Sequence, residues 1–190
     1  MRSKQRISLF GSIKIMTTAA MLTAMSVVIG IFCKNFLNFG TGPYAGLFRI
    51  TFENLPILAA GLMFGPLVGG AVGLSADVIS YLLSRQVYPI NPLVTLGAMA
   101  VGLVCGLVSH YAVKQPGKLR IVLSCALAHL VGSMIIKPLG LYQFYGVAVL
   151  WRIPLYLAIA PTEIALLCLI HRNKNIRSLL DGKKGEHREH

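Results

Sequence analysis

Four long runs of apolar residues constrain this chain more than any other feature. They are Ile15–Cys33, Pro92–Val113, Ile121–Ile136 and Ile153–Ile170, and Glu163 is the one Asp, Glu, Lys or Arg residue within them. A helix needs about 20 apolar residues to cross a hydrocarbon core of about 30 Å. Only 13% of the residues are charged and 55% are apolar, whereas soluble domains carry roughly 25% charged residues. The sequence therefore predicts an all-α integral membrane protein.

The stretch Ile50–Leu83 is a fifth apolar region and is too long for one crossing. As a single helix it would extend about 51 Å, well beyond the hydrocarbon core. Gly65 and Pro66 lie near its middle, and this pair is typical of a helix end followed by a new helix start. We therefore expect two helices here, which gives a bundle of six transmembrane helices.

The distribution of basic residues predicts the orientation of this bundle. With six spans and both termini cytoplasmic, 13 of the 18 Lys and Arg residues fall on the cytoplasmic side, as the positive-inside rule requires. Five spans would turn two basic clusters outward. Arg2, Lys4 and Arg6 precede the first run as in a signal peptide, but its 19 uncharged residues favour a retained helix. We expect residues 1–172 to form the membrane domain and residues 173–190 a basic cytoplasmic tail.

Several function classes are disfavoured by what the sequence lacks. The net charge of +12 comes from short clusters between apolar runs and not from a basic face, so we expect no nucleic-acid partner. The phosphate-binding loop GxxxxGK[ST] and the motifs HExxH and GxSxG do not occur. The four cysteines are isolated, which argues against a metal site or a disulfide framework. We expect neither an enzyme nor a resident cofactor.

Charged residues at the outer ends of the predicted helices indicate a ligand site. Five cations face that side, where basic residues are usually scarce, together with the carboxylates of Glu53 and Asp77 and several aromatic residues. Such a cavity suits a flat, anionic small molecule. The alternative is an ordinary aromatic belt with surface cations. Our candidate ligand-binding residues are Arg49, Glu53, Asp77, Tyr81, Asn91, His129, Lys137, Tyr142, Trp151 and Arg152. The segments Lys34–Phe48 and Lys137–Gly146 are candidate loop lids over this cavity.

Two ionisable residues lie deeper in the predicted spans. His129 is either a core histidine with an internal partner or part of the outer cavity. For Glu163, which follows Pro161, we favour a contact with another helix or a helix kink over a role in ligand binding, because a carboxylate in a span is costly unless paired.

The first predicted helix carries a pair of small residues, Ala20 and Ala24. Small residues at this spacing let helices approach closely in lipid. The pair either packs inside this chain or forms a docking face for another membrane subunit.

The run Arg49–Asp77, RITFENLPILAAGLMFGPLVGGAVGLSAD, resembles the substrate-binding (S) subunits of energy-coupling factor (ECF) transporters, and the folate-specific branch in particular. The resemblance covers residues 10–172. It implies a six-helix protein of the bacterial plasma membrane that captures folate at the outer face. It also implies partners, namely a transmembrane coupling subunit and two ATPase subunits, with release of the ligand by toppling. Ala20 and Ala24 resemble the AxxxA element by which such subunits dock.

Two other functions remain open from the sequence. One is an S subunit for another vitamin, and the other is a stand-alone small permease. The permease predicts inverted repeats, and none is evident between residues 10–83 and 92–172.

Overall fold

The computed structural model describes residues 13–39, 48–84, 91–113 and 117–172. Apart from an isolated β-bridge between Asn38 and Arg49, the regular structure in these ranges is helical. The helices are α1 (Ile13–Phe36), α2 (Asn54–Phe64), α3 (Pro66–Leu83), α4 (Pro92–Leu107), the π-helical η2 (Val108–Ala112), α5 (Lys118–Ala128), the π-helical η3 (His129–Ile136), α6 (Lys137–Tyr145), the 3₁₀-helical η4 (Gly146–Trp151) and α7 (Arg152–His171).

Four continuous helical runs in the described ranges are long and apolar enough to cross a membrane. They are Ile13–Phe36, Pro66–Leu83, Pro92–Ala112 and Lys118–His171, and α2 is a shorter apolar helix. The last run has 54 residues, more than twice the length of one crossing, and it includes the 3₁₀ turn η4. The all-helical membrane fold is thus confirmed, whereas the number of six spans stays a prediction.

The predicted break at Gly65 and Pro66 is confirmed. α2 ends at Phe64, and Gly65 takes a positive φ of 92°, which residues other than glycine rarely adopt. Pro66 then occupies the first turn of α3, where its missing N–H leaves no bond unmade.

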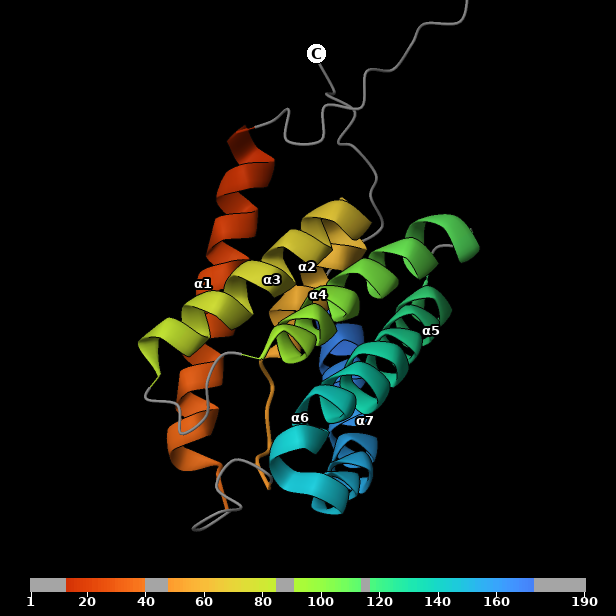
Figure 1. Ribbon diagram of the computed structural model, residues 1–190. Coiled ribbons are helices and arrows are strands. Elements are labelled where there is room, and N and C mark those ends of the chain that lie inside the picture. The colour runs from red at the N-terminus through yellow and green to blue at the C-terminus, as the bar shows by residue number, and fades with distance from the viewer. Residues whose placement is uncertain (1–12, 40–47, 85–90, 114–116, 173–190) are drawn as a thin grey trace, which may run out of the picture.

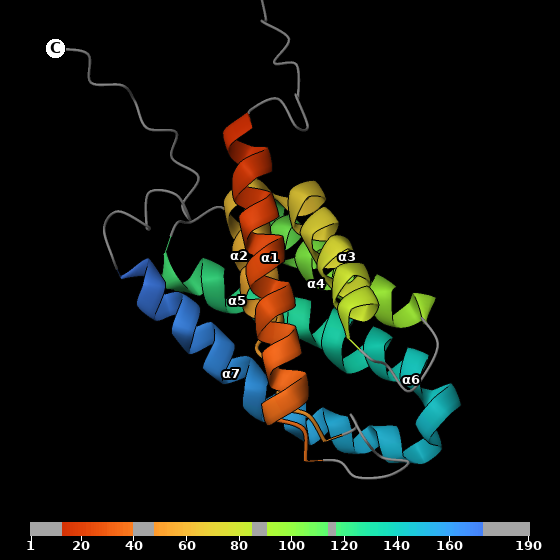
Figure 2. The ribbon, with the colours of Figure 1, turned by 90° about the vertical axis from the view of Figure 1, so that its left-hand side faces the viewer.

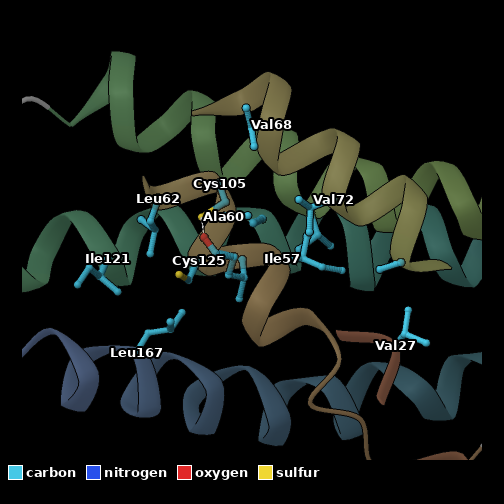
Figure 3. Close-up of a cluster of buried hydrophobic side chains, with 14 residues drawn as sticks. Val27, Ile57, Ala60, Leu62, Val68, Val72, Cys105, Ile121, Cys125 and Leu167 are labelled. Atoms are coloured by element: carbon cyan, nitrogen blue, oxygen red, sulfur yellow. Dashed lines mark hydrogen bonds between the residues drawn. The ribbon is translucent and has the colours of Figure 1, made fainter. Parts of the chain in front are cut away.

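α2 lies at the centre of the bundle. Seven of its eleven residues are buried, as expected for a helix that is apolar on all sides. Figure 3 shows Ile57, Ala60 and Leu62 of this helix among side chains from α3, α5 and α7. The Cys105 thiol on α4 donates to the carbonyl of Leu58 at 3.5 Å. Figures 1 and 2 place α1 along one side of the bundle and α5 to α7 along the other.

Glycines bring α3 and α4 into backbone contact. A Cβ atom on Gly102 would lie 2.0 Å from the carbonyl oxygen of Gly69, far inside van der Waals contact. No larger residue fits there without moving a helix, so these glycines set the spacing of α3 and α4.

One sequence prediction is wrong. Residues 137–146 do not form a loop lid, because Lys137–Tyr145 continue the preceding helix as α6. Pro138 lies in the first turn of α6, where proline is tolerated, and Gly146 ends the helix with a φ of 55°. The other proposed lid, Lys34–Phe48, begins inside α1, and residues 40–47 lie outside the described residues.

Candidate ligand-binding site

Arg49 reaches the site through a short pairing of two chain segments. Phe39 N donates to the Phe48 carbonyl at 3.0 Å, and Ile50 N donates to the Leu37 carbonyl at 3.1 Å. This pairing places Arg49 at the start of α2, where its Nη2 lies 3.5 Å from Glu53 Oε1. This ion pair forms across the entry to α2, before the helix begins.

Glu53 is the centre of the charged group. Its Oε1 also lies 3.7 Å from Lys137 Nζ, and its backbone carbonyl accepts a hydrogen bond from Ser26 Oγ at 2.6 Å. Burial opposes ionisation of Glu53, but Arg49, Lys137, Lys34 and Arg152 outweigh it and lower the pKa of Glu53 from 4.5 to about 2. Glu53 is therefore ionised at neutral pH.

Lys137 is a buried cation, 3% exposed, at the start of α6. Its Nζ donates to Asn54 Oδ1 at 3.2 Å. Its stem passes Gly97 on α4, where a Cβ atom would lie 2.6 Å from Lys137 Cγ. The glycine thus makes room for the lysine to reach Glu53 from the far side of the bundle.

Lys34 and Asp77 complete the group from α1 and α3. Lys34 Nζ donates to Ser80 Oγ at 2.9 Å and to Ser84 Oγ at 3.2 Å. Asp77 accepts a hydrogen bond from Thr95 Oγ1 on α4 at 2.7 Å. We call the part of the bundle that holds Lys34, Arg49, Glu53, Asp77, Lys137 and Arg152 the charged end. It comprises the end of α1, the second half of α3 and the starts of α2, α6 and α7, and the end of α1, α6 and the start of α7 lie toward the lower part of Figure 1.

A small cavity lies within the charged end. It has an empty volume of about 240 Å³ including its mouth, and its lining consists of Ser26, Glu53, Ile57, Ala76, Asp77, Ser80, Ala98 and Lys137. The enclosed space within it is about that of one water molecule. A vitamin-sized ligand, which needs a pocket of about 300–1,000 Å³, therefore does not fit unless the charged end opens.

Several polar atoms near this cavity have no hydrogen-bond partner within the protein. They are Arg49 Nε, Thr51 Oγ1, Asn54 Nδ2 and Arg152 Nε, and all are buried. Arg152 otherwise donates from Nη2 to Tyr156 OH at 3.2 Å, with its guanidinium 5.5 Å from that ring's centre. Buried donors without partners are costly, so water or a ligand is needed to satisfy them.

The structure brings only part of the predicted site together. Glu53, Asp77 and Lys137 line the cavity, and Arg49 pairs with Glu53. Arg152 is buried and contributes to the field at Glu53.

The remaining predicted ligand contacts lie outside the cavity lining. Tyr81 is half-buried in the last turn of α3. Asn91 caps α4 by accepting from Leu93 N and donates to the Gly140 carbonyl. Tyr142 and Trp151 are 57% and 65% exposed. Their roles in ligand binding stay predictions.

His129 and Glu163 form a pair in the interior. His129 Nε2 lies 2.8 Å from Glu163 Oε2, and the two side chains are 1% and 0% exposed. This is a close polar contact between η3 and α7. The interpretation of Glu163 as a partner for another helix is confirmed.

Ala20 and Ala24 are both exposed on α1. The possibility that this pair packs inside the chain is therefore wrong. Large apolar neighbours on the same helix, among them Met21, Met25 and Val28, are also exposed.

Sequence reasoning missed the neutral residues of the site. Ser26, Asn54, Ser80 and Thr95 each contact a charged residue there. Small polar residues are common in membrane helices, and their one distinguishing signal is that each lies within a few residues of a predicted helix end.

The fold and the site together define a helical membrane protein with a cluster of charged residues around a small cavity at one end of the bundle. The family model "ECF transporter, substrate-specific component" matches residues 14–177. The chain belongs to this family, whose members are transporter components and not enzymes.

Solved structures agree with this assignment. A chain described as FolT bound with folic acid is 25% identical, with a TM-score of 0.62, and the match covers 92% of this chain and 96% of that one. The S component of a bacterial ECF transporter is 22% identical, with a TM-score of 0.61, over 90% of this chain and 98% of that one; it supports the fold alone. No curated protein matches the chain.

Proposed function

We propose that this chain is the folate-binding S subunit of an ECF-type vitamin importer in the bacterial plasma membrane. The observation that carries the proposal is the likeness to FolT bound with folic acid, which extends over 92% of the chain. The family membership makes the chain a substrate-specific component, and the proposal adds which substrate it takes.

The charges of the site are complementary to folate. Four cations (Lys34, Arg49, Lys137 and Arg152) face two carboxylates at the charged end, so positive charge is in excess. The carboxylates of the glutamate part of folate would meet these cations, and Arg49 and Arg152 each hold a buried Nε without a partner. Asp77 and Glu53 are acceptors for the N–H groups of the pterin ring.

The size of the cavity adds a condition to this proposal. The cavity has room for about one water molecule, so binding of folate requires the charged end to open. Glu53 is the lining residue that we expect to move, because Glu53 and its partner Arg49 stand at the entry to α2 and neither lies within a helix.

The proposal includes the orientation and the partners. Six spans place the charged end outward and both termini in the cytoplasm. Ala20 and Ala24, exposed on α1, offer a surface of small residues to the transmembrane coupling subunit. Two ATPase subunits bound to that subunit then drive toppling and release of folate inside.

Calorimetric titration of the purified, detergent-solubilised chain with folate tests the substrate, with riboflavin as the control ligand. We expect one-to-one binding of folate without ATP or partners, and no binding of riboflavin. Arg49→Gln should weaken folate binding at least tenfold. Its matched control is Lys118→Gln, which removes an exposed cation at the start of α5, away from the charged end, and should change affinity less than twofold.

Binding of riboflavin instead of folate would contradict the folate assignment and point to an S subunit for another vitamin. Failure to bind either ligand would remove the capture function. Uptake of folate by cells that lack the ATPase partners would indicate a stand-alone permease.

A further inference from the structure

The buried pair of His129 and Glu163 lies outside the cavity lining described above. Both side chains are fully buried, in a region where ionisable groups are costly and usually functional. His129 lies on η3 and Glu163 lies in the middle of α7. The pair therefore ties the helix that leads to the ligand site to the last helix of the bundle.

A row of buried polar residues connects this pair with the ligand site. His129, Ser133 and Lys137 follow one another at intervals of four residues and are 1%, 0% and 3% exposed. His129 Nδ1 lies 3.4 Å from Ser133 Oγ. At the far end of the row, Lys137 contacts Asn54 and Glu53.

The backbone between His129 and Lys137 has an unusual form. Residues His129–Ile136 are π-helical, and Lys137 N donates to the carbonyl of Gly132, five residues earlier. π-helical segments are rare and are frequently found at functional sites. A return to α-helical bonding would rotate every later residue relative to α4, including Lys137.

Close packing shows that Lys137 tolerates little rotation. A Cβ atom at Gly97 on α4 would lie 2.6 Å from Lys137 Cγ. A Cβ atom at Gly132 on η3 would lie 2.5 Å from Cγ2 of Val101 on α4. The lysine stem reaches the cavity through this narrow passage only while η3 keeps its present register.

We propose that His129 and Glu163 are positioning residues, which hold η3 in its π-helical register and so present Lys137 to the ligand. This inference rests on the proposed function of the charged end. His129 is the first residue of the π segment η3, and its partner Glu163 belongs to α7. His129 on η3 contacts Glu163, and the other ionisable groups that interact electrostatically with Glu163 are Cys125 on α5, Lys137 on α6 and Glu53 before α2.

The test compares folate affinity and amide hydrogen exchange in variants of the full chain. Glu163→Leu removes the partner of His129 at similar volume, and His129→Leu removes the other half. We expect each to weaken folate binding at least tenfold and to speed exchange of the amides of residues 132–137, with α2 and α3 unchanged. Glu163→Gln keeps an acceptor for the imidazole N–H and should lose less than threefold.

Leu167→Ala is the matched structural control. Leu167 lies one turn after Glu163 on α7 and is 1% exposed in the apolar core. This variant should lower the thermal midpoint at least as much as Glu163→Leu, yet change folate affinity less than twofold. A purely structural role of Glu163 predicts that the two variants behave alike.

The double variant Glu163→Leu with Lys137→Met separates action through Lys137 from direct action. The Glu163 change should have no further effect on affinity when Lys137 is already replaced. An undiminished effect in that background, or unchanged exchange of residues 132–137 in Glu163→Leu, overturns the inference.

If the unmodified chain binds no folate, the proposed function fails, and the exchange measurement still decides whether the pair holds η3. If Glu163→Leu does not fold, His129→Leu gives the same comparison, with Glu163→Gln as the conservative variant.

Discussion

Glu53 shows how a single carboxylate organises several helices. It has Arg49 on one side and Lys137 on the other, at 3.5 Å and 3.7 Å, and its carbonyl receives the Ser26 hydroxyl of α1. A Cβ atom on Gly30 of α1 would lie 2.9 Å from Glu53 Oε2, so α1 passes close to the carboxylate at this glycine. The residue is thus both a ligand candidate and the counter-ion that makes burial of Lys137 tolerable.

The lowered pKa of Glu53 predicts a specific dependence of stability on pH. Because its pKa falls from 4.5 to about 2 in the folded chain, ionised Glu53 stabilises the fold at pH values above 4.5, and this contribution is lost as the pH falls toward 2. Glu53→Gln should lower the thermal midpoint in detergent at pH 7. The difference between the two proteins should shrink between pH 4.5 and about 2. A difference that stays constant over this window would contradict the assignment, and Lys118→Gln serves as the control.

At the scale of elements, two kinds of close approach decide how helices pair. Inside the bundle, Gly69 and Gly102 bring α3 and α4 to backbone distance. Outside it, Ala20 and Ala24 are exposed among methionines and other apolar side chains on α1. Small residues therefore allow close helix packing within the chain at α3 and α4, whereas on α1 they form part of an exposed surface.

Gly102→Ala should disturb the pairing of α3 with α4. The added Cβ atom would meet the Gly69 carbonyl oxygen at 2.0 Å, and overpacking of this kind typically costs about 1–3 kcal/mol. We expect a lower thermal midpoint in detergent. Leu96→Ala, at an exposed position of the same helix, should leave the midpoint nearly unchanged. An unaltered midpoint in Gly102→Ala would show that the two helices adjust freely.

Ala20→Leu and Ala24→Leu should abolish folate uptake while sparing binding by the purified chain. Their side chains are exposed, so the larger residue disturbs no internal contact but blocks close approach of a partner helix. Uptake by cells with the complete transporter and calorimetry of the isolated chain give the two readouts. Ala126→Leu, at an exposed position of α5, should affect neither. Loss of binding in Ala20→Leu would mean that the residue acts within the bundle.

For the whole molecule, the direction of each helical run decides which residues share an end. α6, the start of α2 and the start of α7 meet at the charged end (Figures 1 and 2). The start of α5 lies at the other end, with Lys118 exposed. One long helical run, Lys118–His171, joins the two ends and returns through η4.

Cysteine labelling tests the orientation of this arrangement. Val147→Cys places a thiol at an exposed position in η4, near the charged end, and Lys118→Cys places one at the opposite end. In intact cells, a membrane-impermeant maleimide should label position 147 but reach position 118 only after permeabilisation. The native cysteines are buried or half-buried, and the unmodified chain measures their background. The reverse labelling pattern would place the charged end in the cytoplasm.

The sequence alone determined the membrane fold and the break between α2 and α3. Long apolar runs are suited to a lipid bilayer and not to water. Gly65 and Pro66 end one helix and start the next because of their local backbone preferences. These properties depend on neighbouring residues and are therefore readable from the chain. The likeness to S subunits in Arg49–Asp77 was likewise a local signal.

Only the tertiary structure decided which polar residues meet. Lys137 and Asn54 are 83 residues apart, and no local pattern pairs them or selects Glu163 as the partner of His129. The continuation of the helix through Lys137–Tyr145, which sequence reasoning took for a loop, depends on the packing of η3 and α6 against α4. The sequence also left the exposure of Ala20 and Ala24 undecided, because small apolar residues occur on both the bundle-facing and the lipid-facing sides of a membrane helix.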